Sequence, residues 1–379
     1  MTSSDSDSDS GSIGSLSLRA PAKLNLGLRL LGVRPDGYHL IESLFAPIEL
    51  WDEVELEVLP GSREIDLEVE LAPDSGLPPS LARIPSGPEN LVWRAASAFC
   101  AAYDVRARIR IRLRKRIPAA AGLGGGSSDA AAVLRALATL TRQDDGLGDR
   151  AALSKLAGEL GADVPFFLQP EPALVTGIGE QIEPVVDLPG LDVVVANPGI
   201  GLATAEVYRA ADALGSALTP SGPGSTMRAL SRLRASENLA QGRNQGQARD
   251  WRNALGDLLV NDLEPAGRRL CPPVGRLLTE LRRLGALGAS MTGSGATVFG
   301  VFASAEEAGA AAAEISDAAN AGEASVPGLG SGEGLGRKRE AGSTKHGEAR
   351  ALPSRGGVRW VRATRLGLPR VDLPGVSWG

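Results

Sequence analysis

The sequence predicts an α+β protein of two domains. A chain of 379 residues exceeds the usual size of one domain and is long enough to bury the core of an enzyme. Segments in which apolar and polar residues alternate, as in strands, are interspersed with segments of helical composition. Hydrophobic residues make up 43% and charged residues 22% of the chain, values typical of a soluble globular protein.

The composition argues against several classes of protein. Lys and Arg number 40 against 45 acids, so a net charge of -5 disfavours a dedicated nucleic-acid binder. Cys100 and Cys271 lie in apolar stretches without CxxC spacing, which favours buried thiols over a disulfide or a metal site. No apolar run reaches the ~18 residues that a membrane span needs. Residues 1–15 are rich in Ser and Asp, unlike a signal or transit peptide, and predict a disordered tail on a cytoplasmic protein.

Alternation and turn chemistry predict the first elements in chain order. A half-buried strand is expected over Ala20–Leu31, and Pro35-Asp36-Gly37 supply a turn after it. Two further alternating strands are expected over 52–59 and 65–71. A proline-rich surface connection follows over 73–88, and then a helix over 89–103.

The most basic stretch of the chain, residues 106–116, is open to two interpretations. A run of six arginines and one lysine is compatible with a nucleic-acid arm. However, Ile109, Ile111 and Leu113 occupy strictly alternate positions. This pattern favours an amphipathic strand with one apolar face and one solvated or phosphate-facing edge.

The second half of the chain mixes regular elements with two polar segments. Helices are expected over 128–140, with Ser127 or Ser128 as N-cap, and over 150–160. Residues 215–247 are polar with scattered Gly and Pro, and residues 322–355 are rich in Gly and charge. Both are predicted to be flexible inserts. Strands are expected over 173–176, 191–196 and 358–366.

The stretch PAAAGLGGGSSDAAAVL, residues 118–134, predicts an anion-binding loop. It lacks the lysine of a P-loop, and the G-x-G-x-x-G dinucleotide pattern fails at Ser127. Its four glycines allow backbone N–H groups to surround an anion, and the helix that follows directs its positive end toward that anion. The serine hydroxyls add donors, or ligands for a hard cation such as Mg²⁺. The alternative is a glycine-rich turn that only permits close packing.

This loop resembles the P-x-x-x-G-L-G-G-G-S-S-[ND]-A-A phosphate loop of the GHMP kinase superfamily. Further stretches resemble one branch of it, whose alcohol substrate carries cytidine diphosphate: PAKLNL, DGYHLIESLF, LGADVPFFL, GIGEQIEPV and MTGSGATVFGVF. The similarity runs in order over residues 18–302. The loop residues that the resemblance assigns to ATP are Pro118, Ala119, Ala120, Ala121, Gly122, Leu123, Gly124, Gly125, Gly126, Ser127 and Ser128.

The resemblance implies a two-domain GHMP kinase fold with the active site in the interdomain cleft. The phosphate loop then belongs to an N-terminal domain of residues 16–187, and the GSGAT turn of residues 293–297 to a C-terminal domain of residues 188–379. The implied reaction transfers the γ-phosphoryl group of ATP, with Mg²⁺, to the 2-hydroxyl of 4-(cytidine 5′-diphospho)-2-C-methyl-D-erythritol. The expected partner is this small-molecule substrate, with no nucleic acid and no membrane.

Two charged residues are the catalytic candidates. Asp163 is a lone acid among apolar residues, and by itself suits a helix cap or a turn as well as a general base. Lys23 is the only charge in APAKLNL, where a strand lysine that reaches to the surface is the alternative. The resemblance assigns the base to Asp163 and places Lys23 beside it, where its charge favours the ionised carboxylate.

The resemblance also implies a substrate pocket. Tyr38 and His39 are expected to recognise cytosine, and Asn25 to contact the polyol end. Thr204 and Tyr208 are expected on the far side of the pocket. Two other functions stay open at this point: a different kinase of the superfamily, and a nucleotide-binding protein without catalysis.

Overall fold

The structure, a computed structural model, describes most of the chain, namely residues 12–141, 149–215, 222–240, 245–324 and 360–367. The tail expected over residues 1–15 therefore lies largely outside the described residues. Its last two residues do not belong to a tail, because strand β1 already begins at Gly14.

The first of two sheets is built around one long strand. Strand β2 pairs antiparallel with β1 along its length, with β4 near its end and with β5 near its start, and β3 adds to β4 in parallel. The strands of this sheet are β1 (Gly14–Val33), β2 (His39–Leu59), β3 (Glu64–Leu71), β4 (Arg108–Lys115), β5 (Ala173–Gly177) and β6 (Gln181–Pro184).

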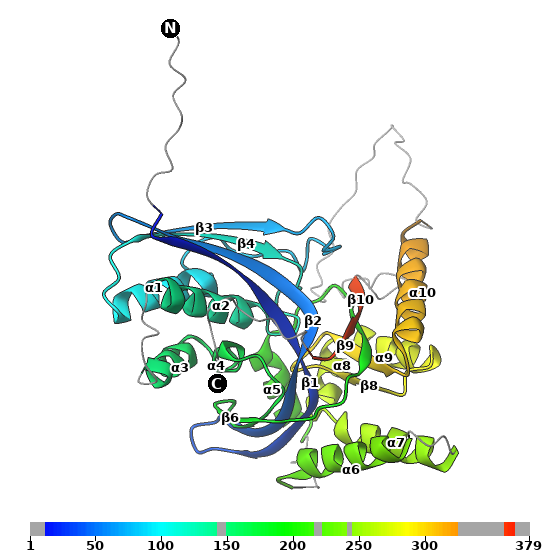
Figure 1. Cartoon of the computed structure of the whole chain (residues 1–379). Coiled ribbons are helices and arrows are strands. Elements are labelled where there is room, and N and C mark those ends of the chain that lie inside the picture. Colours follow the sequence, from blue (N-terminus) through cyan, green and yellow to red (C-terminus); the bar gives the residue numbers. More distant parts are fainter. Residues whose placement is uncertain (1–11, 142–148, 216–221, 241–244, 325–359, 368–379) are drawn as a thin grey trace, which may run out of the picture.

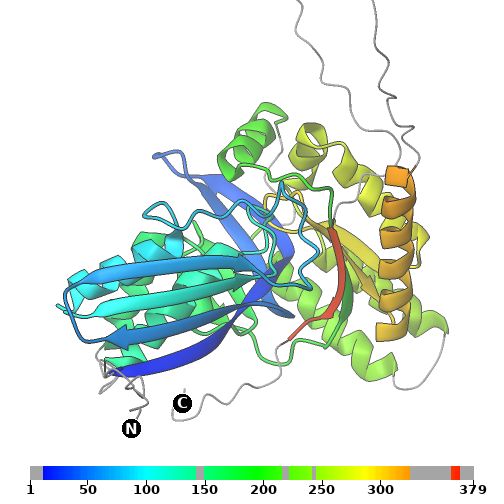
Figure 2. The ribbon, with the colours of Figure 1, turned by 90° about the horizontal axis from the view of Figure 1, so that it is seen from above.

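Four helices lie on one side of this sheet, below β3 and β4 in Figure 1 and behind the strands in the view from above in Figure 2. Apolar residues of the helices and of the inner sheet face, such as Phe99, Leu134 and Ile111, form one core. The helices are α1 (Leu91–Ala102), α2 (Gly125–Leu140), α3 (Asp149–Leu160) and α4 (Val164–Leu168).

The second sheet is antiparallel and has the order β10-β7-β9-β8. Helices α8, α9 and α10 pack beside it, and α6 and α7, at the foot of the molecule in Figure 1, share a second core with its strands β7 and β9. Its strands are β7 (Asp192–Asn197), β8 (Gly288–Met291), β9 (Val298–Phe302) and β10 (Trp360–Arg365). The remaining helices are α5 (Thr204–Ala213), α6 (Ser225–Ala240), α7 (Gln245–Leu258), α8 (Glu264–Leu270), α9 (Pro273–Arg283) and α10 (Ala305–Ala324).

Strand β1 is more buried than its alternation predicts. All residues from Ala20 to Leu30 are buried, so the expectation of a half-buried strand is wrong. The polar positions of the pattern, including Lys23 and Asn25, face other parts of the protein instead of water. Backbone bonds join the strand to the segment after α7, with Leu28 N donating to Val260 O at 2.8 Å and Asp262 N donating to Leu28 O at 2.9 Å.

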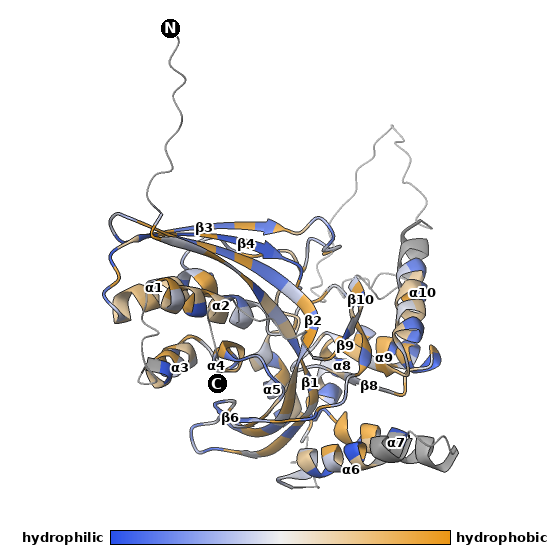
Figure 3. Ribbon diagram, in the orientation of Figure 1, coloured by the Kyte–Doolittle hydropathy of each residue, from blue (hydrophilic) through white to orange (hydrophobic). Residues whose placement is uncertain are grey.

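Strand β4 confirms the amphipathic interpretation of the basic stretch. Ile109, Ile111 and Leu113 are fully buried, and Figure 3 shows hydrophilic and hydrophobic residues alternating along β3 and β4. The outward arginines pair with acids of the neighbouring strands β2 and β3. Arg112, for example, faces Glu55 of β2 and Glu68 of β3, with N–O distances of 3.4 and 3.3 Å. Acids of this chain therefore occupy the edge that was expected to face solvent or phosphate.

The prediction of a flexible insert over residues 215–247 is wrong where the structure describes that segment. Helix α6 and the start of α7 lie there. The physical reason is a buried interface, because Leu230 and Leu233 of α6 pack with Leu255 and Leu258 of α7 in one core. Within the second predicted insert, residues 322–324 end helix α10, and residues 325–355 lie outside the described part.

The strands of the first sheet precede the proposed domain boundary, and those of the second sheet follow it. The first sheet uses residues 14–184 and the second uses residues 192–365. Division at residues 187 and 188 stays a prediction. None of the helices in the described part of the chain is long and apolar enough to cross a membrane.

Candidate active site

The glycine loop joins β4 to α2 and lies at the centre of the site. Helix α2 begins at Gly125, and its N-cap is Gly124, whose φ of 74° is left-handed. The prediction of Ser127 or Ser128 as N-cap is therefore wrong. Glycine takes this conformation without the Cβ clash that a serine would suffer, so the helix starts earlier and its first N–H groups point into the loop.

Two glycines of the loop permit contacts that no other residue would allow. A Cβ on Gly122 would lie 2.6 Å from the carbonyl oxygen of Thr292, at the start of the GSGAT turn. A Cβ on Gly124 would lie 2.8 Å from the ring of Phe167 and 3.2 Å from Cγ of Lys23. The loop therefore touches the GSGAT turn on one side, and Lys23 and helix α4 on the other.

Lys23 and Asp163 form an ion pair beside this loop. Nζ of Lys23 lies 3.6 Å from Oδ2 of Asp163, and the lysine side chain is 4% exposed while the aspartate is 33% exposed. Burial lowers the pKa of the Lys23 ammonium, and the charge of Asp163 opposes this shift. Burial excludes a lysine that reaches to the surface. Asp163 occupies the N-cap position of α4, yet its side chain makes no capping bond.

Asn25 holds this lysine from the next inward position of β1. Its Oδ1 accepts a hydrogen bond from Nζ of Lys23 at 2.6 Å, and its Nδ2 donates to Oγ of Ser43 at 2.9 Å. Its backbone N–H donates to Oγ1 of Thr292 at 3.0 Å. Asn25 therefore connects the ion pair to the GSGAT turn of the second sheet.

The residues expected to recognise cytosine meet at the far end of the same cleft. The rings of His39, at the start of β2, and Tyr208, on α5, lie 4.8 Å apart and tilted by 42°. Nε2 of His39 lies 2.8 Å from Oδ1 of Asp212. Burial, followed by the charge of Asp163, raises the pKa of Tyr208 to about 12, so its hydroxyl stays protonated near neutral pH. Tyr38 lines the cleft but is 60% exposed.

Sequence reasoning missed Asp212. It stands one helical turn after Tyr208 on α5, and this spacing places both side chains on one helix face. Thr204, which begins the same helix, lies 3.1 Å from Ser294 through the two hydroxyl oxygens. Residues of α5 and of the GSGAT turn therefore contact each other at the cleft.

Two clefts meet at the glycine loop. The larger, of about 640 Å³, contains Lys23, Asn25, Tyr38, His39, Asp163, Thr204 and Tyr208 among its lining residues. The smaller, of about 400 Å³, is lined by residues 118–122 and 124–127 of the loop, by residues 83–85 and 89–91, and by Lys115 and Asp129. Gly122, Gly124 and Thr204 line both clefts. A group held in the smaller cleft can therefore reach a partner in the larger one at these three residues.

A buried charge cluster, also missed from the sequence, underlies the loop. Nζ of Lys115 lies 2.5 Å from Oδ2 of Asp52 and 2.5 Å from Oδ2 of Asp129, and all three residues are buried. Burial opposes the lysine charge, but the two carboxylates outweigh it and raise the pKa of Lys115. Burial and the charge of Asp52 raise the pKa of Asp129 well above its ordinary value. The sequence carries a signal for this cluster, because Lys115 falls on the apolar face of β4.

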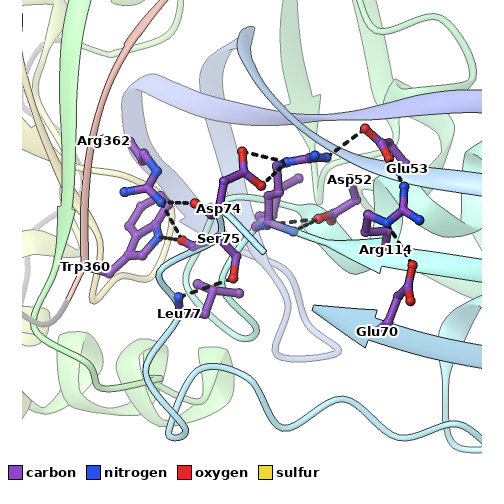
Figure 4. Close-up of polar contacts among 11 residues, drawn as sticks. Asp52, Glu53, Glu70, Asp74, Ser75, Leu77, Arg114, Trp360 and Arg362 are labelled. Atoms are coloured by element: carbon purple, nitrogen blue, oxygen red, sulfur yellow. Dashed lines mark hydrogen bonds and ion pairs between the residues drawn. The ribbon is translucent and has the colours of Figure 1, made fainter. Parts of the chain in front are cut away.

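The outer wall of the smaller cleft belongs to the segment predicted as a surface connection. The second sheet holds this segment in place, because Nε1 of Trp360 donates to the carbonyl of Ser75 at 3.1 Å and Nη2 of Arg362 donates to the same oxygen at 2.7 Å. Figure 4 shows these two residues on one side of Asp74 and Ser75, with the Glu53–Arg114–Glu70 ladder on the other. Leu81 O accepts a bond from the loop residue Ala119 at 3.0 Å.

Metal ligands are sparse in this region. Within the residues that the structure describes, no three His, Cys, Asp or Glu side chains gather into a group that could hold an ion. Two side-chain oxygens at the start of α2, Oγ of Ser128 and Oδ1 of Asp129, are buried without a hydrogen-bond partner. These two oxygen atoms are therefore available as metal ligands at the start of α2.

Two family profiles match the chain. The profile described as GHMP kinases N terminal domain matches residues 90–170, and the one described as GHMP kinases C terminal matches residues 235–321. The 4-diphosphocytidyl-2-C-methyl-D-erythritol kinase of Citrifermentans bemidjiense is 39% identical over 80% of this chain and 95% of its own length. The enzyme of the same name from Pelotomaculum thermopropionicum is 42% identical over 76% of this chain and 90% of its own length.

Solved structures of GHMP kinases also resemble this chain. A crystal structure of 4-(cytidine 5'-diphospho)-2C-methyl-D-erythritol kinase is 36% identical and superposes with a TM-score of 0.61, covering 80% of this chain and 96% of that chain. The structure of L. major mevalonate kinase in complex with R-mevalonate has a TM-score of 0.58 over 94% of this chain and 97% of that chain. Its identity of 15% shows a shared fold alone.

Proposed function

Because the chain belongs to the 4-diphosphocytidyl-2-C-methyl-D-erythritol kinases of the GHMP kinase family, we propose that its two clefts bring ATP and this cytidine substrate together. The enzyme transfers the γ-phosphoryl group of ATP to the 2-hydroxyl of 4-(cytidine 5′-diphospho)-2-C-methyl-D-erythritol. The products are the 2-phosphate and ADP. This step belongs to the methylerythritol phosphate pathway of isoprenoid precursor biosynthesis.

One observation carries this proposal: the Lys23–Asp163 pair lines the larger cleft, and Lys23 lies next to Gly124, which lines both clefts. The smaller cleft holds ATP, with its phosphates against the N–H groups of the glycine loop and the N-terminus of α2. The larger cleft holds the alcohol. Transfer requires the attacking oxygen to line up with the γ-phosphorus, and Gly122 and Gly124 line both spaces.

Asp163 acts as the general base on the 2-hydroxyl. Its side chain is one-third exposed and makes no capping bond, so one carboxylate oxygen is available to accept the proton. The ammonium of Lys23, 3.6 Å from Asp163, draws the polyol oxygen toward this carboxylate. Asn25, bonded to Lys23, offers amide groups to the remaining hydroxyls of the polyol.

The cytidine end of the substrate lies against His39, Tyr208 and Tyr38. The two close rings provide an apolar face for the base, and the His39 ring, held by Asp212, donates to or accepts from a base edge. Thr204 lies nearer the phosphate loop, because it lines both clefts. We therefore expect it to contact the diphosphate part of the substrate.

Magnesium accompanies ATP in this proposal. The ion prefers oxygen ligands, and it is commonly held by substrate phosphates, water and one or two protein groups. Asp129, which lines the smaller cleft, carries an unpartnered oxygen at the start of α2 and fits such a limited contribution. When bound, the ion neutralises phosphate charge.

An ADP-release assay tests the function. The cytidine substrate, mevalonate and homoserine are each offered with ATP to the wild-type enzyme and to Asp163→Asn. We expect turnover with the cytidine substrate alone, and its loss in the variant. Turnover of mevalonate or homoserine at a comparable rate would contradict the substrate, and full activity of Asp163→Asn would contradict the assigned base.

A further inference from the structure

A third cavity lies behind the helix that follows Asp163. It has a volume of about 270 Å³ and opens between α2, α3, α4 and the strands β5 and β6. None of its lining residues lines either cleft of the proposed active site. The residues that matter here are Arg135, Leu153, Ser154, Phe166, Gln169, Glu171 and Ile182.

Arg135 of α2 lines this cavity, and its guanidinium has no counterion in the part of the chain that the structure describes. Nε of Arg135 is buried and has no hydrogen-bond partner, and within the described residues no acid pairs with the side chain. Glu171, the only acid that lines the cavity, is exposed to solvent. Burial lowers the pKa of Arg135, and no nearby charge opposes this shift. Charged side chains are seldom buried unless they are paired, and this partly buried arginine has no acidic partner among the residues that the structure describes.

The remaining walls define what would fit. Leu153 and Phe166 are buried and Ile182 is half-buried, so they offer an apolar surface next to the guanidinium. Ser154 and Gln169 stand exposed at the rim and can add hydrogen bonds. We propose that this cavity binds a small amphipathic anion, a phosphate or carboxylate head on a short apolar chain, with the head on Arg135 and the chain on Leu153, Phe166 and Ile182.

The cavity is coupled to the proposed active site through aromatic contacts. Phe166 packs edge-on against Phe45, with ring centroids 5.2 Å apart, and Nζ of Lys23 lies 4.5 Å from the centroid of the Phe45 ring. Phe166 is also three residues after Asp163, the N-cap of the same short helix. A ligand that contacts Phe166 therefore touches a residue that packs against Phe45, next to Lys23, and that follows Asp163 in the chain. Binding itself does not depend on phosphoryl transfer, so it can be tested without turnover.

Calorimetric titration with monobutyl phosphate tests the proposal. The protein is first saturated with ADP and Mg²⁺ so that the glycine loop is occupied, and pentanoate and pentanol serve as further probes. Wild-type protein should bind both anions but not pentanol. Arg135→Met should bind monobutyl phosphate at least tenfold more weakly than wild type. Arg135→Lys should lose less affinity than Arg135→Met, because lysine keeps the charge but not the planar guanidinium. Arg94→Gln, an exposed α1 arginine outside the cavity, should bind within twofold of wild type.

Thermal unfolding without ligand distinguishes a ligand site from a structural arginine. An unpaired buried charge destabilises the folded state, so Arg135→Met should unfold at the same temperature as wild type or higher. A clear fall in that temperature would mean that the guanidinium has a structural partner in this chain, which overturns the proposal. Absence of binding to wild type, or equal binding to Arg135→Met, overturns it as well.

Discussion

At Lys23, burial and a neighbouring carboxylate act on one ammonium group in opposite directions. Burial lowers its pKa, while Asp163 at 3.6 Å favours the charged form. The amide oxygen of Asn25 accepts a hydrogen bond from the same nitrogen. A lysine in this setting is held in one place and does not sample solvent, which suits a group that orients a substrate oxygen.

The pair should behave as one catalytic unit. Asp163→Asn keeps the shape of the side chain but removes the base, so turnover should fall by ~10²-fold or more while ATP binding is nearly unchanged. Lys23→Ala should cause a similar loss. The double variant should be little worse than either single variant, because residues that act together are not additive. Single-turnover rates and nucleotide titrations measure both effects, and retention of half the wild-type turnover in Asp163→Asn would remove it from the mechanism.

Tyr208 should contribute to recognition of the cytidine substrate. Stacking of a base on an aromatic ring is worth ~1–3 kcal/mol, so Tyr208→Ala should raise the KM for this substrate by roughly tenfold to a hundredfold. The KM for ATP should stay within about twofold, because Tyr208 does not line the smaller cleft. Tyr208→Phe should restore most of the loss, since stacking needs the ring. An equal rise in both KM values would indicate that the ring only supports His39.

Strand β4 places two kinds of charge on opposite faces, and the two should differ in their effect on stability. Lys115 is buried between Asp52 and Asp129, whereas Arg112 pairs with acids in solvent. Removal of one member of a buried ion pair costs about 3–5 kcal/mol, so Lys115→Met should lower the free energy of unfolding by that order. Arg112→Gln should change the urea midpoint little, and less still at high salt.

The pH dependence of the Lys115→Met protein should have a definite sign. The folded-state pKa of Asp129 is already raised, by burial and then by the charge of Asp52, and loss of the lysine removes the group that opposes this shift. Folded Asp129 then holds a proton at pH values where the unfolded aspartate has lost it. Stability of the variant should therefore increase as pH falls from 8 toward 5, and urea titrations at several pH values would measure it. A pH-independent difference from wild type would contradict this explanation.

Strand β10 is expected to support the nucleotide cleft from a distance. Arg362 bonds the carbonyl of Ser75, in the segment that continues to the cleft wall at Arg83 and Pro85. A hydrogen bond is worth ~1 kcal/mol, so Arg362→Met should raise the KM for ATP roughly fivefold and leave kcat and the KM for the cytidine substrate nearly unchanged. Arg365→Met, on the same strand, is the matched control. A loss that is equal for both substrates would point to a general folding defect instead.

Sequence patterns predicted the elements better than the contacts between them. The alternation of residues 106–116 predicted β4, and helix composition predicted α1 and α3 within two residues of their bounds. The pairings of Lys115 with Asp52, His39 with Asp212 and Arg362 with Ser75 join residues far apart in the chain. No local periodicity reports such a pairing. Helix α6 was missed for the same reason, because its burial depends on α7 and not on its own composition.

At the scale of the whole molecule, the candidate site is assembled from both halves of the chain. Lys23, His39, Asp163 and the glycine loop come from the part that forms the first sheet, and Thr204, Tyr208 and the GSGAT turn from the part that forms the second. The resemblance supplied these residues from the sequence, and the structure brings them to one pair of clefts. The structure adds the contacts of Asp212, Lys115 and Arg362, which hold the two clefts in place.

Residues 325–355 should be dispensable for catalysis. The relative from Citrifermentans bemidjiense is matched over 95% of its length by 80% of this chain, so about a fifth of this chain has no counterpart in it. Residues 325–355 lie outside the residues that the structure describes and beyond the family profile that ends at residue 321. Their Gly-rich, charged composition lacks the apolar residues that a packed core needs, and the entropy of closing a loop grows only slowly with its length. Replacement by a Gly-Ser linker of about ten residues, which can span up to ~33 Å, should therefore keep kcat and both KM values within about twofold. Steady-state kinetics and a thermal unfolding curve of the shortened protein measure this directly. A large loss of activity at unchanged stability would instead assign the segment a part in the reaction.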